Sequence, residues 1–280
     1  MRTKLWMAVV LVVLTACEQQ QNDAATMDVE FVVSGWTMEV EPMTRALESD
    51  GQEMTDLWIF DYVGEQCVQT VHQTPADDNF GNPTIPLTYD EHHIYFVASR
   101  GDSPTVDATG HIIRWNIPKD TFWRDYQVRV GPSSSTQYAV ALDRVATRLR
   151  IEVNDAVPAS ISTLSVTPSV WYYGLDYLTG AAVDEQLNRE RSVTVPASYA
   201  GTSGSLTISI FGLSGAEEWS TDLTVSATDA EGNPLGSVNL SGAPFLRNRT
   251  TTYSGNLFGT NRAMSISLSD GWADALQASW

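Results

Sequence analysis

Cys17 is the residue with the most specific chemical surroundings in the chain. It follows Leu14-Thr15-Ala16, an arrangement typical of a bacterial lipobox. Small residues before the thiol let a signal peptidase approach the backbone, and the thiol can be capped with diacylglycerol. We therefore expect Cys17 to be lipidated. Several acyl chains together would anchor the protein stably to a membrane. The alternative is an ordinary cleaved signal with a chance cysteine at this position.

The residues before Cys17 support this prediction. Arg2 and Lys4 form a short positive region, and residues 5–14 form an apolar run. The run is too short to cross a bilayer, which takes about 20 residues, but it suits the core of a secretory signal. We therefore expect a signal peptide over 1–16. Residues 17–26 are polar and read as a tether.

No arrangement of side chains predicts catalysis. His92 and His93 are neighbours, and adjacent residues of a strand point to opposite faces, so they cannot chelate one metal ion together. The sequence has no His-Glu-x-x-His motif and no Cys/His cluster. Gly212-Leu213-Ser214-Gly215 lacks the final glycine of a nucleophile elbow because residue 216 is Ala. We expect no enzyme, no metal and no cofactor.

The second cysteine, Cys67, has no partner if Cys17 is lipidated. It lies in the strand-like run Cys67-Val68-Gln69-Thr70-Val71. We expect it to be a buried, inert thiol.

Charge excludes another class of function. The formal net charge is −18, from 16 basic and 34 acidic residues. Removing 1–16 takes away Arg2 and Lys4 and leaves 14 basic against 34 acidic residues, or −20. Such a chain repels phosphate backbones, so we expect no nucleic-acid partner.

Two aromatic runs suggest an alternative function. They are Phe122-Trp123-Arg124-Asp125-Tyr126 and Trp171-Tyr172-Tyr173-Gly174-Leu175-Asp176-Tyr177. Exposed aromatic rings stack on sugars, so a surface glycan-binding lipoprotein is the second hypothesis. Core packing is the more usual role of such residues.

The elements that must position these residues are strands. Alternating apolar residues recur, as in Val29, Phe31 and Val33 or in Leu149, Ile151 and Val153. About fourteen strand-like segments follow one another at the spacing of a β-sandwich, which is too many for one sandwich of about seven strands. The sequence therefore predicts an all-β fold with two β-sandwich domains in tandem, over 27–142 and 143–280.

The last seventeen residues keep one register. Seven apolar residues fall on even positions, and Asp270 and Asp274 interrupt the same face. The members are Met264, Ile266, Leu268, Trp272, Leu276, Ala278 and Trp280. Either residues 264–269 close the second sandwich and the tail packs locally, or residues 273–280 extend outward and pair with another molecule by β-augmentation.

The segment 41–55, which follows the first strand, is polar and has one basic residue, Arg45. An arginine in an exposed loop is accessible to an arginine-specific protease, although most such residues are only solvated.

Taken together, these motifs resemble the fimbrillins of Bacteroidales, the subunits of type V pili. The resemblance covers most of the chain. It is carried by the lipobox at Cys17, Thr44-Arg45-Ala46, Met54-Thr55-Asp56-Leu57-Trp58-Ile59-Phe60-Asp61-Tyr62, His92-His93-Ile94-Tyr95-Phe96-Val97-Ala98, Arg247-Asn248-Arg249-Thr250-Thr251-Thr252-Tyr253 and Ala278-Ser279-Trp280.

The resemblance implies two transthyretin-like, Greek-key sandwiches and export as a lipoprotein to the outer membrane. It implies that an arginine-specific protease cuts between Arg45 and Ala46, which removes the first strand. A strand of a neighbouring subunit then fills the vacated groove, and Leu276, Ala278 and Trp280 are the donor residues expected here. The implied function is that of a structural fimbrial subunit that supports adhesion, with other subunits as partners in an extracellular fimbrium.

Overall fold

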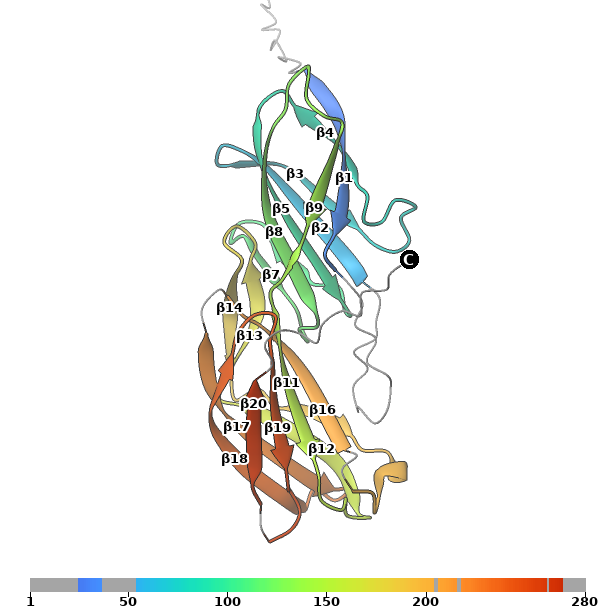
Figure 1. Ribbon diagram of the computed structural model, residues 1–280, viewed down its shortest axis with the longest axis vertical. Coiled ribbons are helices and arrows are strands. Elements are labelled where there is room, and N and C mark those ends of the chain that lie inside the picture. Colours follow the sequence, from blue (N-terminus) through green and yellow to red (C-terminus); the bar gives the residue numbers. More distant parts are fainter. Residues whose placement is uncertain (1–24, 37–53, 204–205, 216–217, 261, 269–280) are drawn as a thin grey trace, which may run out of the picture.

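A computed structural model of the chain describes residues 25–36, 54–203, 206–215, 218–260 and 262–268. These residues form twenty strands and one short 3-10 helix, η1 (Ala197–Tyr199). The expected all-β fold is confirmed. In the described part of the chain, no helix is long and apolar enough to cross a membrane. The sheets are stacked along the long axis of an elongated molecule (Figure 1).

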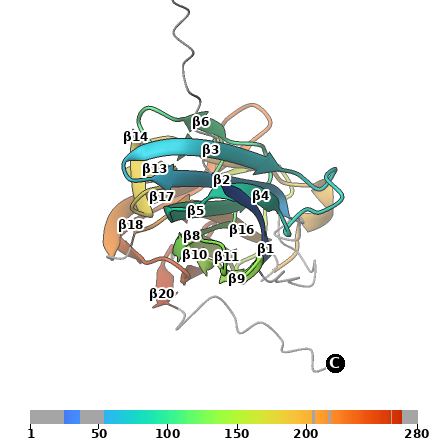
Figure 2. The ribbon, with the colours of Figure 1, turned by 90° about the horizontal axis from the view of Figure 1, so that it is seen from above.

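Two sheets pack face to face in the first half of the chain and enclose an apolar core (Figure 2). The smaller sheet has the order β4 (Thr84–Thr88), β1 (Thr26–Ser34), β9 (Gln137–Ala141). The larger sheet has the order β10 (Asp143–Arg144), β8 (Thr121–Arg129), β5 (Glu91–Arg100), β2 (Met54–Val63), β3 (Gln66–Gln73).

Two further sheets enclose the core of the second half. The first has the order β16 (Leu206–Leu213), β11 (Ala146–Val153), β19 (Thr250–Gly255), β20 (Met264–Leu268). The second has the order β15 (Arg191–Thr194), β12 (Ile161–Pro168), β17 (Trp219–Asp229), β18 (Pro234–Phe245). Leu149, Ile151 and Val153 of β11 face this core, as their alternation predicts.

The fifth sheet takes strands from both halves of the chain. Its order is β14 (Ala181–Leu187), β13 (Val170–Asp176), β7 (Ile112–Arg114), β6 (Thr105–Asp107). The β6–β7 hairpin pairs antiparallel with β13 through Leu175↔Ile113. The predicted boundary at 142/143 falls between β9 and β10, and the division into two domains stays a prediction.

A third apolar cluster lies beneath this shared sheet. The rings of Phe60 and Tyr177 stack with their centroids 3.9 Å apart. The hydroxyl groups of Tyr62 and Tyr177 form a hydrogen bond, with 3.2 Å between the two oxygens. Desolvation is the main reason that the pKa of Tyr177 lies well above its usual range. The cluster explains why β2 is apolar on both faces: one face covers the first core and the other covers the shared sheet.

Candidate functional site

The predicted site residues lie outside the described part of the chain. They are Cys17, Arg45, Ala46, Leu276, Ala278 and Trp280. The structure does describe the strands next to three of them: β1 begins nine residues after Cys17, and β1 and β2 flank the segment that holds Arg45 and Ala46. The candidate site built here is therefore the slot that β1 occupies.

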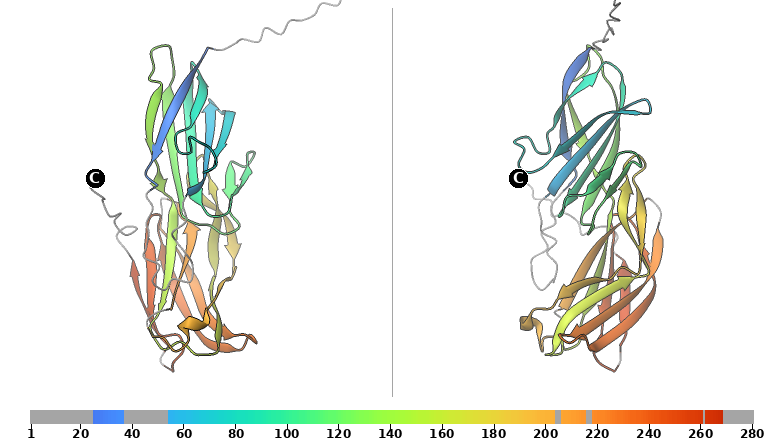
Figure 3. Two further views of the ribbon diagram at one scale, coloured as in Figure 1. Left: turned by 90° about the vertical axis from the view of Figure 1, so that its right-hand side faces the viewer. Right: turned by 180° about the vertical axis from the view of Figure 1, so that it is seen from behind.

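β1 is the middle strand of the small sheet. It pairs antiparallel with β4 through Val29↔Ile85 and parallel with β9 through Phe31↔Tyr138. In the described residues neither β4 nor β9 has another neighbour in its sheet. Without β1, each would present unpaired backbone amides and carbonyls, which are a template for another strand. Figure 3 shows β1 crossing the surface of the molecule.

The inward side chains of β1 plug the first core. Val29 and Phe31 are fully buried and Val33 is 7% exposed. The Phe31 ring lies 5.4 Å from the ring of Phe96 and 6.1 Å from that of Tyr138, measured between centroids. Removing β1 would therefore open an apolar groove with an aromatic pocket at its centre, as the alternating pattern of Val29, Phe31 and Val33 indicates.

The chain leaves the slot at Gly35, which has a left-handed backbone conformation. Its φ is +90°, and a Cβ on this residue would lie 2.4 Å from the carbonyl oxygen of Leu142. Leu142 N–H in turn donates to Ser34 O at 2.8 Å. Trp36 then stacks on Phe80 with 5.7 Å between ring centroids and packs against the first core.

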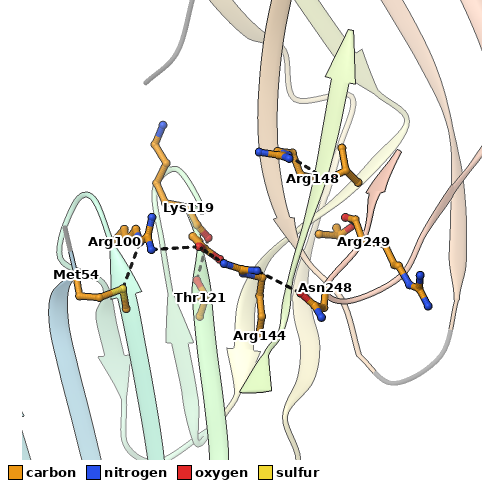
Figure 4. Close-up of polar contacts among 11 residues, drawn as sticks. Met54, Arg100, Lys119, Thr121, Arg144, Arg148, Asn248 and Arg249 are labelled. Carbon is orange, nitrogen blue, oxygen red and sulfur yellow. Dashed lines mark hydrogen bonds and ion pairs between the residues drawn. The ribbon is translucent and has the colours of Figure 1, made fainter. Parts of the chain in front are cut away.

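Charged side chains contact one another beside the end of the slot, where the chain passes from the first half into the second. Arg144 holds Asp120 with two bonds, Nε to Oδ1 at 2.8 Å and Nη2 to Oδ2 at 3.1 Å. Arg100 Nη2 lies 3.7 Å from Asp120 Oδ2, and Arg144 Nη1 donates to Asn248 Oδ1 at 3.3 Å. The Asp120, Arg100 and Arg144 side chains are all less than a tenth exposed. Arg144 belongs to β10 of the larger first-half sheet, and its bond to Asn248 is the contact of this group that reaches the second half (Figure 4).

A buried hydrogen bond between Asp61 and His92 lies inside the first core. His92 Nδ1 is 2.8 Å from Asp61 Oδ1, and His92 Nε2 is 3.0 Å from the carbonyl oxygen of Thr88. The pair therefore ties β2 and β5 of one sheet to β4 of the other. Burial raises the pKa of Asp61 above its ordinary value, although the hydrogen bond from His92 opposes this. His93 points to the opposite face, where it contacts Asp125, as the strand periodicity predicts.

The structure gives no support to two sequence interpretations. Trp171 is fully buried and donates its Nε1–H to Phe211 O, and the partly buried Trp123 donates to Tyr177 O. These two residues therefore do not form the exposed platform that a glycan site needs. Cys67, which was expected to be buried, is exposed on β3, the last strand of its sheet among the described residues.

Other features were missed by the sequence reasoning. The buried network around Asp120 and the pairing of β7 with β13 join residues that are far apart in the chain. The only local signal was the dense aromatic composition of the segment around Tyr177. Among the described residues, no group of three or more His, Cys, Asp or Glu side chains could hold a metal ion.

The end of the described chain corrects one detail. β20 pairs antiparallel with β19 and forms the edge of its sheet, as expected for residues 264–269. However, Ile266 and Leu268 are 49% and 41% exposed. They share the register of the predicted donor residues, on the strand that ends the sheet order β16–β11–β19–β20.

Comparisons with known proteins were made for sequence and for fold. No family model matches the sequence, and no curated protein is similar to it. A protein provisionally named an adhesin from Bacteroides ovatus has a similar structure, with a TM-score of 0.52 at 8% identity over 81% of this chain and 87% of that one. A provisionally named polysaccharide-binding protein from Bacteroides thetaiotaomicron gives 0.50 at 9% identity over 88% and 96%.

A third solved structure is the tip fimbrial protein Mfa3 from Porphyromonas gingivalis, truncated at its C-terminus. It gives a TM-score of 0.46 at 12% identity over 87% of this chain and 99% of that one. The two structures with TM-scores of 0.52 and 0.50 show a common fold with this chain. It agrees with the all-β fold class that the sequence predicts.

Proposed function

We propose that the chain is a structural subunit of a cell-surface fimbria and that subunits join when the C-terminal strand of one fills the β1 slot of the next. The observation that carries the proposal is the position of β1. It joins β4 to β9 and buries Val29 and Phe31 completely. The fold shared with a provisionally named adhesin of Bacteroides ovatus supports an adhesive role at the cell surface.

Proteolysis between Arg45 and Ala46 would separate β1 from the rest of the subunit. In the chain, β1 is followed by 37–53 and then by β2, so this cut breaks the covalent link between β1 and β2. The cut strand would remain held by two ladders and by three inward apolar side chains. Displacement by an incoming strand, rather than spontaneous loss, is therefore the step that opens the slot.

The incoming strand is the tail that holds Leu276, Ala278 and Trp280. Alternate residues of a strand point to one face, so these three side chains can replace Val29, Phe31 and Val33 as plugs of the groove. Such β-augmentation supplies backbone hydrogen bonds for affinity and side-chain pockets for specificity. An interface of about 1,500 Å² or more has the size of a stable protein–protein contact.

The partners and the location follow from the same steps. Lipid on Cys17 would hold the newly exported subunit at the outer membrane. An arginine-specific protease would release it, because the cut removes the residues up to Arg45 together with the lipid. Other fimbrial subunits are then its partners in the extracellular fimbrium.

Treatment of the purified chain with an arginine-specific protease tests the proposal. We expect a new N-terminus at Ala46 by mass spectrometry, followed by a ladder of polymers on native gels. Deleting residues 273–280 should leave a folded monomer that is cut but does not polymerise.

R45A is the matched control for the cut, because it removes only the predicted cleavage site. It should stay monomeric under the same treatment. Polymers that form equally well from R45A, or from the chain without 273–280, would contradict the proposal.

A further inference from the structure

The two ends of β1 are paired differently. Residues 26–30 pair with β4, whereas β9 pairs only with 30–34. β1 starts at the end of the first half that lies far from the second half, and it runs toward the second half (Figure 1). We therefore call 26–29 the outer end and 30–36 the inner end. Among the described residues, the outer end has a neighbouring strand on one side only.

The inner end has neighbours on both sides. Phe31 N–H donates to Pro83 O and Val33 N–H donates to Gly81 O, each at 2.9 Å, so the ladder that begins on β4 continues past that strand. On the other side, the same two residues lie in the ladder with β9. Detaching the inner end therefore breaks hydrogen bonds along both of its edges.

The backbone of Asp28 faces the side of the outer end that has no described strand. Alternate residues of a strand bond to the same neighbour, and Phe31 and Val33 donate toward the β4 side. Val29 therefore bonds toward β4 as well, and Asp28 faces away from it. β9 reaches β1 only at Glu30. The outer end is thus an open edge, at which another strand can pair.

Side-chain packing divides β1 in the same way. Val29 is the one fully buried residue of the outer end, and two of the other three residues are exposed. In the inner end, Phe31 lies among three aromatic rings, and Trp36 stacks on Phe80 with 5.7 Å between ring centroids. Opening the outer end therefore costs less free energy than opening the inner end.

Opening of the outer end makes β4 available to another strand. Ile85 and Leu87 of β4 lie opposite Val29 and Met27. When the outer end opens, the backbone groups of these two β4 residues lose their partners, and the place of Val29 in the first core is vacated. Local openings of this kind occur without unfolding of the whole domain. An arriving strand can then form its first bonds before the inner end has moved.

Resting on the proposed function, we propose that the C-terminal strand of a second copy enters the slot at the outer end of β1. It pairs first with Ile85 and Leu87 of β4 and takes the place of Val29 in the first core. It then displaces β1 toward Ser34. Trp36 leaves last, so its aromatic contact holds the cut strand until the exchange is nearly complete.

This order gives the proteolytic cut a defined role. In the uncut chain the outer end can open, but the inner end stays linked to β2 through residues 37–53. Cleavage at Arg45 therefore does not start the exchange. It permits the last step, which is the release of the inner end.

Amide hydrogen exchange of the uncut chain tests the opening order without any polymer. Val29, Phe31 and Val33 all donate toward the β4 side, so their amides are a matched set. We expect the amide of Val29 to exchange at least about ten times faster than the other two, because the outer end opens by itself. Equal protection of the three amides, or greater protection of Val29, would overturn the inference.

The variants V29A and V33A test where the second copy enters. Each replaces a buried valine of β1 with alanine, and β1 is absent from the assembled product, so neither variant changes the final interface. Urea denaturation of the uncut chains gives the stability that each variant loses. Size-exclusion chromatography after cleavage gives the rate at which the fragment ending at Arg45 is released.

We expect nearly all of the stability lost in V29A to appear as faster release, a fraction of about 1, because Val29 detaches before the slowest step. For V33A the fraction should be below about 0.3. Release should also become faster at higher protein concentration, because a second copy takes part in it. A fraction for V33A that equals or exceeds that for V29A would overturn the inference, as would a release rate that does not depend on concentration.

W36A is a second probe of the inner end. Because Trp36 leaves after the slowest step, we expect W36A to release the fragment less than about three times faster than the wild type. Release from W36A that is faster than release from V29A would place the entry at the inner end and overturn the inference.

Failure of this inference can be told apart from failure of the proposed function. Polymers that form with V33A or W36A as the fastest variant overturn the point of entry alone. If the cut wild type forms no polymers, the proposed function fails, and the entry of a second copy fails with it.

Discussion

Phe31 is the side chain on which the slot depends most. It is fully buried, and its ring meets those of Phe96, Tyr126 and Tyr138 at centroid distances of 5.4, 6.1 and 6.1 Å. Aromatic contacts of this kind add to the effect of the buried area. A strand that replaces β1 must therefore bring a large apolar group to the same place, and Trp280 is the largest in the tail.

Replacing Phe31 measures what this pocket contributes. We expect F31A to lower the free energy of unfolding of the uncut chain by about 3–5 kcal/mol, because it leaves a cavity among three rings. V32A, whose side chain points away from the core on the same strand, should cost less than about 1 kcal/mol. Urea denaturation of both variants checks this. Equal losses for the two would contradict the assignment of β1 as a plug.

The buried Asp61–His92 pair makes a pH-dependent contribution to stability. Because burial raises the pKa of Asp61, the folded chain holds its proton to higher pH than the unfolded chain does. The contribution of Asp61 is therefore complete below its ordinary pKa and is lost as pH rises through the folded value.

D61N isolates this contribution. We expect the difference in the free energy of unfolding, wild type minus D61N, to fall as pH rises from about 4 toward neutrality. Urea denaturation of both proteins over that range gives the difference directly. A difference that rises with pH would show that Asp61 is instead held in its charged form.

At the scale of elements, β1 is the strand that pairs with both β4 and β9. Its covalent link to β2 is a segment that contains one arginine, Arg45. The strand ends at Ser34, directly before Gly35, where the positive φ and the close approach of Leu142 O leave no room for a side chain. The end of β1 is thus fixed against the junction with the second half.

Substitution of Gly35 tests this fixed end. We expect G35A to destabilise the uncut chain by more than about 2 kcal/mol, since it adds a backbone clash to an unfavourable φ. G64A is the matched control: Gly64 also has a positive φ, +60°, but nothing lies within 4 Å of its added Cβ. It should cost only about 1–2 kcal/mol. Thermal unfolding compares them, and equal losses would contradict the account.

Much of this element level could be predicted from the sequence. The alternation of Val29, Phe31 and Val33 and that of Leu149, Ile151 and Val153 were expected, because period-2 patterns are local signals. Three features could not be predicted: the pairing of β7 with β13, the Asp120–Arg144 contact and the exposure of Cys67. Each of them depends on which distant strands pair with one another, and no local pattern in a single sequence specifies that pairing.

At the scale of the whole molecule, the two halves are joined by more than the peptide chain. The shared sheet, the apolar cluster around Tyr177 and the hydrogen bond from Arg144 to Asn248 all join one half to the other. The two halves are therefore held together by side-chain contacts as well as by strand pairing.

Arg144 tests this joint. We expect R144A to lower the free energy of unfolding by about 3 kcal/mol, because it leaves Asp120 buried with only the longer contact to Arg100. R124A removes the exposed pair with Asp143, at 2.9 Å, and should cost about 0–1 kcal/mol. Urea denaturation monitored by tryptophan fluorescence separates them. A loss for R144A as small as that for R124A would mean that the joint contributes little.

A reversible lock on β1 tests most directly whether the slot must be vacated before subunits join. Val32 and Ala139 are paired neighbours on β1 and β9 with outward side chains, so V32C/A139C in a C67S chain should form a disulfide that keeps β1 in place after proteolysis. We predict that the cut, oxidised protein stays monomeric and that a reducing agent starts polymerisation. Polymers that form equally fast with the disulfide intact would contradict the account.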